Sequence, residues 1–220
     1  MYSKHTNATA KFATFFQLKN VNQINQQALS RDMTELQNMK GLLNSQRIKL
    51  LFGHYGIELI FQEDNIRISN LHSNGIMRTC AIVNFSLPIP VWLKNTHNKI
   101  YHGSSIGQTI KDQGFELTKG DVYFGVVNLP KAVKDKMETD EDLAAVHIYQ
   151  LLVKNPETSQ SLVYCTISEV HSPLYFTLED LRQLNPESQK NSNLTELGQK
   201  SLKELSTLDQ YFTLSKANQP

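Results

Sequence analysis

Two arginines in a stretch typical of β-sheet are the residues of this chain best suited to bind an anion. Arg67 and Arg78 lie on either side of Asn74-Gly75, a pair that favours a two-residue hairpin turn because both turn positions need positive φ. With this turn, Arg67 is predicted to face Ile82, and Arg78 lies on the same face as Arg67. A guanidinium group suits a carboxylate because its fork of N–H groups matches both oxygens.

The predicted pairing divides the hairpin into two faces. The first face is apolar and is expected in the core: Ile66, Ile68, Met77, Ala81, Val83 and Phe85. The second face has an apolar centre and two cations: Arg67, Ser69, Arg78, Cys80 and Ile82. This pattern predicts a sheet floor with a place for an anion. The alternative is an Arg67 that is solvated or paired with a carboxylate, as arginines in strands commonly are.

Two further segments have residue types that would suit chemistry. The small-residue loop Gly103–Gly107 would offer backbone N–H groups to an anion at the start of a helix, but it has neither a dinucleotide-binding nor a P-loop pattern. An ordinary helix start is the alternative. The carboxylates at 138 and 140–142 would suit a metal or acid–base role, whereas neighbouring residues on a helix point apart, which favours a solvated face.

Composition excludes several classes of protein. The chain has 220 residues, and its net charge of +1 gives no field that would select nucleic acid. It lacks the long apolar run that a membrane span needs. Cys80 and Cys165 lie in predicted strands, as buried thiols of a reducing, cytoplasmic compartment do. The seven histidines are scattered without the usual ligand spacing, so no metal site is expected.

Periodicity and turn residues predict an α+β fold with a single antiparallel sheet, helices packed on one face and a C-terminal helical extension. Besides the hairpin, strands are expected at 57–62, 121–127, 146–153 and 162–170, with 121–127 in the centre. Helices are expected at 33–52 in two pieces, at 91–101, at 131–145 and at 178–184. A further short helix is expected to begin at the Gly103–Gly107 loop and to end at 113.

The chain ends differ in character from the predicted domain at 32–175. Residues 1–31 contain no acidic residue and are expected to form a weakly ordered lead-in, with an organellar transit peptide as the alternative. The extension, 176–220, has apolar residues at helical spacing: Leu194, Leu197, Leu205, Leu208 and Phe212. This face is expected to pack on the body of the chain or on a protein partner.

The order of four segments resembles chorismate lyase and its wider superfamily, which includes effector-binding domains of transcription regulators. The similar segments are Leu42–Ser45 leading into Ile57–Ile60, Arg67–Leu71 before the turn, Gly103–Gly107 followed by Glu116–Lys119, and Ser172–Tyr175. Together they span about residues 42–175.

This resemblance implies a sheet that encloses a small aromatic carboxylate. The lyase of the family converts chorismate to 4-hydroxybenzoate and pyruvate without a cofactor, for ubiquinone biosynthesis. Arg67 matches the family's catalytic, substrate-binding arginine. Ile106 and Gly107 match a turn whose backbone contacts ligand, and Ser45 and Gln46 lie near another ligand contact.

One position departs from the family. The lyase has a glutamate on its last strand, and the same position here is Thr166, which would bind substrate but cannot act as a general acid near neutral pH. Glu169 is expected on the opposite face, and Arg78 would reach the ligand from the far end. Two functions follow: a lyase with weak or absent turnover, or a module that binds a small carboxylate without converting it.

Overall fold

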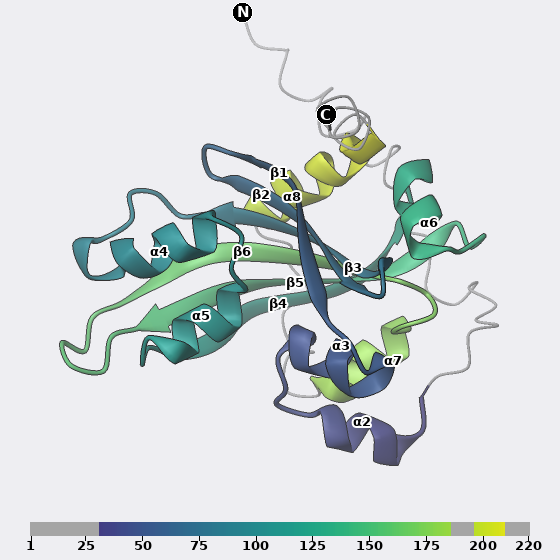
Figure 1. The fold of residues 1–220 in the computed structure, drawn as a ribbon, viewed down its shortest axis with the longest axis horizontal. Helices are drawn as coiled ribbons and strands as arrows, with labels where there is room; N and C mark the ends of the chain where they lie inside the picture. Colours follow the sequence, from purple (N-terminus) through teal and green to yellow (C-terminus); the bar gives the residue numbers. More distant parts are fainter. Residues whose placement is uncertain (1–30, 186–195, 210–220) are drawn as a thin grey trace, which may run out of the picture.

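A six-stranded antiparallel sheet forms the centre of the computed structural model, which describes residues 31–185 and 196–209. The strand order is β1-β2-β3-β6-β5-β4 (Figure 1). The strands are β1 (Gly56–Glu63), β2 (Ile66–Ser73), β3 (Ile76–Phe85), β4 (Glu116–Asn128), β5 (Leu143–Lys154) and β6 (Ser161–His171). The predicted α+β class with one antiparallel sheet is confirmed, whereas the predicted lead-in lies outside the described residues, apart from Arg31.

The hairpin of β2 and β3 has the predicted turn but not the predicted register. Asn74 and Gly75 both have positive φ, 52° and 85°, as a two-residue turn requires. A β-bulge then places Arg78 as an extra residue in β3, so that Arg67 pairs with Val83. The predicted pairing of Arg67 with Ile82 is therefore wrong by one residue.

The bulge changes which side chains share a face, because a shift of one residue turns every side chain of a strand to the other side. Ala81 and Val83 lie on the face of Arg67 and line a cavity there. Cys80 and Ile82 lie on the other face, where they belong to the same core cluster as Ile68. Each of these four residues of β3 therefore lies on the face opposite to its predicted one.

The strand predicted for the centre of the sheet lies at its edge. β3 pairs directly with β6, whereas β4 pairs with β5 alone. The helix predicted at 131–145 ends at Met137, because Glu138 takes a left-handed conformation with φ 52°. From Leu143 onward the chain belongs to β5. The sequence did not predict this end of the helix, because glutamate is not a residue typical of the left-handed conformation.

Helices cover both faces of the sheet (Figure 1). The face of Arg67 packs against α2 (Met33–Met39), α3 (Asn44–Phe52), α4 (Lys94–Tyr101), α5 (Ile106–Asp112) and α7 (Leu178–Leu184). This is the predicted helical layer. The opposite face packs against α6 (Lys131–Met137) and α8 (Glu196–Ser206). A short 3-10 helix, η2 (Val91–Leu93), precedes α4.

The C-terminal extension uses its apolar face within the chain. Leu202, Leu205 and Leu208 are buried in one core cluster with Met77 and Val170 of β3 and β6. A protein partner is therefore not needed to cover this part of the extension. Of the other leucine and phenylalanine positions predicted for this face, 194 and 212 lie outside the described residues.

In the described parts of the chain, none of the helices has the length and apolar character that crossing a membrane would require.

Candidate functional site

A cavity of about 90 Å³ lies between the sheet and the starts of α3 and α5. Its walls are mainly apolar, with Leu43 from the start of α3 and Val83 and Leu151 from the sheet. Three charged side chains interrupt this lining: Arg67, Lys119 and Glu169. This volume is well below the about 300–1,000 Å³ of pockets for drug-sized ligands, so the cavity suits only a much smaller ligand.

Arg67 is anchored from β2 to the loop that follows α4. It is 1% exposed, and its guanidinium donates to the carbonyls of Ile100 at 2.6 Å, Ser104 at 3.0 Å and Gly103 at 3.3 Å. Its Nε donates to Ser69 Oγ at 2.9 Å. Burial lowers the Arg67 pKa, but an arginine remains protonated in proteins. Because a guanidinium has five N–H donors, one remains to be offered to a ligand.

Lys119 projects from the edge strand β4 to the cavity. Its ammonium lies 3.9 Å from the centre of the Tyr149 ring and has no hydrogen bond or ion pair among the described residues. Lys119 is exposed to solvent, yet the protein atoms packed around its ammonium remove part of its hydration. This loss of hydration lowers the Lys119 pKa from 10.5 to about 8, against the opposing effect of Glu169. Lys119 is thus mostly protonated at neutral pH and has its donors free.

Glu169 is a buried carboxylate on β6, opposite His147 of β5. Asn44, at the start of α3, donates to Glu169 Oε1 at 3.0 Å, and Tyr175 in turn donates to Asn44 Oδ1 at 2.8 Å. Burial alone would raise the Glu169 pKa, but His147 and the charge of Lys119 hold this pKa well below its usual range. The carboxylate is therefore ionised, with one oxygen held by Asn44.

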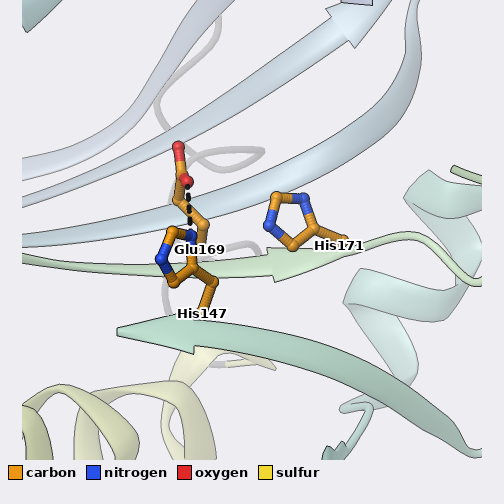
Figure 2. Close-up of side chains that lie close together, drawn as sticks. All are labelled: His147, Glu169 and His171. Carbon is orange, nitrogen blue, oxygen red and sulfur yellow. Dashed lines mark ion pairs between the residues drawn. The ribbon is translucent and has the colours of Figure 1, made fainter. Parts of the chain in front are cut away.

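Two histidines lie beside this carboxylate (Figure 2). His147 Nδ1 is 3.7 Å from Glu169 Oε2, and the His147 ring stacks on Phe124 with centroids 4.8 Å apart. His171 Nδ1 is 3.1 Å from Thr79 Oγ1. Burial lowers the pKa of His147 to about 4 and that of His171 to about 3. Both imidazoles are neutral at neutral pH.

The charges that line the cavity do not cancel. Arg67 and Lys119 are positive, Glu169 is negative, and no other charged side chain lines the cavity within the described ranges. The net positive charge is surrounded by apolar walls, where charges interact more strongly than in water. Such a cavity attracts a small anion that also has apolar surface.

Three of the predicted site residues line the cavity together with Arg67. Ser45 lies in the first turn of α3, and Ile106 and Gly107 begin α5. The loop before α5 acts differently from its prediction, because its carbonyls accept from Arg67. The loop thus holds the guanidinium in place. α5 begins at Ile106, as in the ordinary helix start that was the alternative expectation for this segment.

The other predicted site residues lie away from this cavity. Arg78 stacks on the ring of Phe52, 4.0 Å from its centre, and does not line the cavity. Gln46 is exposed and its side chain accepts from the Leu43 N–H, as a helix cap. Thr166 points to the opposite face of β6 from Glu169. The expectation that Arg78, Gln46 and Thr166 line the pocket with Arg67 is therefore wrong.

Sequence reasoning missed the two charged residues that complete the cavity. It took Thr166 as the pocket residue of the last strand by counting from Ser172, whereas Glu169 occupies the pocket face. The two lie on opposite faces, as expected, so the error was in choosing the face. Lys119 was part of a recognised segment, and the Glu169-Val170-His171 alternation was the available signal for a pair of polar groups on one face.

Comparisons with protein families and with curated proteins find no match. Among solved structures, the chain is similar to the crystal structure of the PhnF C-terminal domain, with 11% sequence identity and a TM-score of 0.36. The similarity covers 60% of this chain and 77% of that chain. A likeness this distant does not assign a ligand or an activity, so the geometry of the cavity is the basis for the proposed function.

Proposed function

We propose that the protein binds a small organic carboxylate in the cavity between β2, β4, β6 and the starts of α3 and α5. The observation that supports this function is the charge of the lining, with Arg67 and Lys119 against Glu169 alone. Lys119 would supply most of the binding to the carboxylate, because its three N–H donors have no protein acceptor. Arg67 would add its one remaining donor.

The apolar walls define the rest of the ligand. Leu43, Val83 and Leu151 would contact a ring or a short hydrocarbon, and Tyr55 and Tyr149 add polarisable ring surface. Glu169 would accept a hydrogen bond from a hydroxyl group of the ligand. A small hydroxy carboxylate such as 4-hydroxybenzoate has these groups in one molecule.

Calorimetric titration with three ligands of one shape would test this function. The probes are 4-hydroxybenzoate, 4-hydroxybenzyl alcohol and 4-hydroxybenzylamine, which are anionic, neutral and cationic. We expect the carboxylate to bind and the amine not to bind. Equal affinity for the alcohol and the carboxylate would overturn the proposal, because the charged lining would then contribute nothing.

A pair of lysine variants gives the matched control. Lys119→Met removes the free ammonium and keeps the length of the side chain, whereas Lys111→Met removes an exposed ammonium on α5 outside the lining. We expect affinity for 4-hydroxybenzoate to fall about tenfold or more in Lys119→Met, since a hydrogen bond to a charged group contributes about 1.5–3 kcal/mol. Lys111→Met should bind as the unaltered protein does.

A second candidate function is the cleavage of chorismate to 4-hydroxybenzoate and pyruvate. The observation that favours it is Glu169, a carboxylate in the same cavity as Arg67. The reason to expect weak turnover was Thr166, which lies outside this cavity. Incubation with chorismate, followed by assays of both products, tests this activity. Glu169→Gln should abolish it, whereas Thr166→Val should leave it unchanged; the opposite pattern, or no product, would reject the lyase.

The cellular compartment belongs to the same proposal. Cys80 and Cys165 are both free and fully buried, as is common for thiols in a reducing compartment. We therefore propose a cytoplasmic protein, a location that fractionation of cells expressing the tagged chain would test.

A further inference from the structure

Two histidines and a glutamate from neighbouring strands form a buried cluster of metal-ligating side chains beside the cavity. His147 on β5 and Glu169 on β6 are direct cross-strand partners, and His171 follows two residues later on the same face of β6. One nitrogen or oxygen atom of each lies within 4.8 Å of the others. None of the three residues is more than 6% exposed. The sequence did not predict this grouping, because the residues are distant in the chain or separated by a single position.

The distance between His147 and Glu169 is close to that of a metal site. His147 Nδ1 and Glu169 Oε2 are 3.7 Å apart, whereas two ligand atoms at about 2.1 Å from a tetrahedral zinc ion would be about 3.4 Å apart. Figure 2 shows the His147 ring against the Glu169 carboxylate, with the His171 ring beside them. The ligand atom of His171 lies within 4.8 Å of those of His147 and Glu169, so the three side chains would have to come closer to share one ion.

An unsatisfied polar atom of the cluster is a second, independent observation. Nε2 of His171 is buried and has no hydrogen-bond partner in the part of the chain that the structure describes. A buried polar atom without a partner costs about 1–3 kcal/mol. Thr79 occupies Nδ1 of His171, so Nε2 is the nitrogen left for a ligand. A polar network that served stability alone would be expected to satisfy this atom.

Neighbouring groups also hold the ligands as outer partners do in metal sites. Thr79 Oγ1 contacts Nδ1 of His171 at 3.1 Å, and Asn44 binds Glu169 Oε1 at 3.0 Å. Glu169 Oε2 is left toward His147. Such partners fix the orientation of ligating side chains, and their loss typically weakens metal binding about 10–100-fold.

We propose that His147, Glu169 and His171 bind a divalent transition-metal ion of the zinc type. Two imidazoles and a carboxylate suit this class of ion, whereas calcium and magnesium prefer oxygen ligands alone. Three protein ligands leave a fourth position open, which is the arrangement of catalytic zinc sites. Because Glu169 also lines the cavity, the open position would face the space where we place the carboxylate ligand.

The surrounding charges set the expected strength of this site. Lys119 is positive and acts electrostatically on Glu169 and both histidines, so it opposes a cation. Lys119→Met should therefore bind the metal more tightly, although it should bind 4-hydroxybenzoate more weakly. These opposite signs separate the metal site from the proposed carboxylate function, as does a test with metal alone.

The test is a titration of chelator-treated protein with Zn²⁺, by competition with a chromophoric chelator, and with Co²⁺, by its visible absorption. We expect one ion per chain. The loss of an outer partner typically weakens metal affinity about 10–100-fold, so Thr79→Val should weaken it about tenfold. The loss of a ligand should cost more, and we expect the metal affinity of His171→Ala and of His147→Ala to fall by at least about 100-fold. The control is His54→Ala with His102→Ala, two exposed histidines away from the cluster.

Each result decides for or against the site. Unaltered protein that binds no ion, or cluster variants that bind as tightly as the control, would overturn the proposal. If His171→Ala does not fold, His171→Gln and Glu169→Gln keep a polar side chain at the same place and should still lose the metal. Circular dichroism of each variant would establish that loss of binding is not loss of fold.

Discussion

At the scale of single residues, the environment of a charge decided its role more than its type did. Arg67 and Lys119 both line the cavity, but the structure uses them differently. Arg67 gives most of its donors to backbone carbonyls at the end of α4, whereas Lys119 has no protein acceptor among the described residues. We therefore expect Arg67 to matter mostly for stability and Lys119 mostly for binding.

Arg67→Ala should destabilise the fold strongly. It leaves the carbonyls of Ile100, Gly103 and Ser104 without this donor, and a buried acceptor left unsatisfied costs about 1–3 kcal/mol. Urea unfolding would measure the loss, and Lys99→Ala, an exposed change on α4, is the control. Arg67→Lys keeps the charge but not the fork, and should lie between. An Arg67→Ala protein as stable as the control would contradict this assignment.

Carboxylate binding should weaken at alkaline pH because of Lys119. Its pKa of about 8 means that the ammonium is charged below this pH and neutral above it. The affinity for 4-hydroxybenzoate should be level from pH 6 to pH 7 and should fall by up to about tenfold for each pH unit above 8. Calorimetry across this range would measure the fall.

The groups around Lys119 should not add to this change. Burial raises the Tyr149 pKa well above 10 and lowers the His147 pKa to about 4, while Glu169 is ionised throughout. Lys119→Met should therefore bind equally at pH 7 and pH 9. A fall of the same size in this variant would assign the titration to another group.

At the scale of elements, one extra residue in β3 determined which side chains of this strand line the cavity. The β-bulge at Arg78 follows the paired residues Ile76 and Met77, and the Arg78 side chain stacks on Phe52 of α3. The bulge places Ala81 and Val83 at the cavity in place of Cys80 and Ile82. A bulge has no reliable residue signature, because it depends on how the hairpin meets its neighbours.

Arg78→Ala should leave carboxylate binding unchanged. The side chain is away from the cavity, so its loss removes only the contact with Phe52, which is worth about 0.5–2 kcal/mol. Thermal unfolding and calorimetry with 4-hydroxybenzoate would measure both quantities, with Phe52→Leu as the partner variant. A clear loss of affinity in Arg78→Ala but not in Phe52→Leu would return Arg78 to the site.

At the scale of the whole molecule, the sheet separates two layers with different tasks. The cavity and the histidine cluster lie on the face of α2, α3, α4, α5 and α7. The opposite face is closed by α6 and α8, and α8 belongs to the C-terminal extension. The extension therefore completes the core of the chain on the face away from the cavity.

Leu205→Ala should destabilise the protein without changing its affinity for the carboxylate. Leu205 is 1% exposed in the core under α8, and truncating a buried leucine costs about 2–5 kcal/mol. Leu50→Ala, at a side chain that is 55% exposed on α3, is the control and should cost little. Denaturant unfolding gives the stability, and calorimetry below the unfolding range gives the affinity. A stable Leu205→Ala protein would mean that α8 does not close this core.

The sequence alone determined the local structure and four of the residues that line the cavity. Alternating apolar residues and Asn74-Gly75 predicted the strands and the turn, and Arg67 was identified as a cavity residue with Ser45, Ile106 and Gly107. These features follow from side-chain periodicity and backbone preference, which act within a few residues.

Only the tertiary structure decided the rest of the site. The meeting of Lys119, Glu169 and His147 depends on β4, β5 and β6 lying side by side in one register. A bulge decided which residues of β3 line the cavity. Such contacts join residues that are far apart in the chain, and a shift of one residue reverses the face of each side chain. Their positions are therefore set by the packing of the whole sheet against its helices.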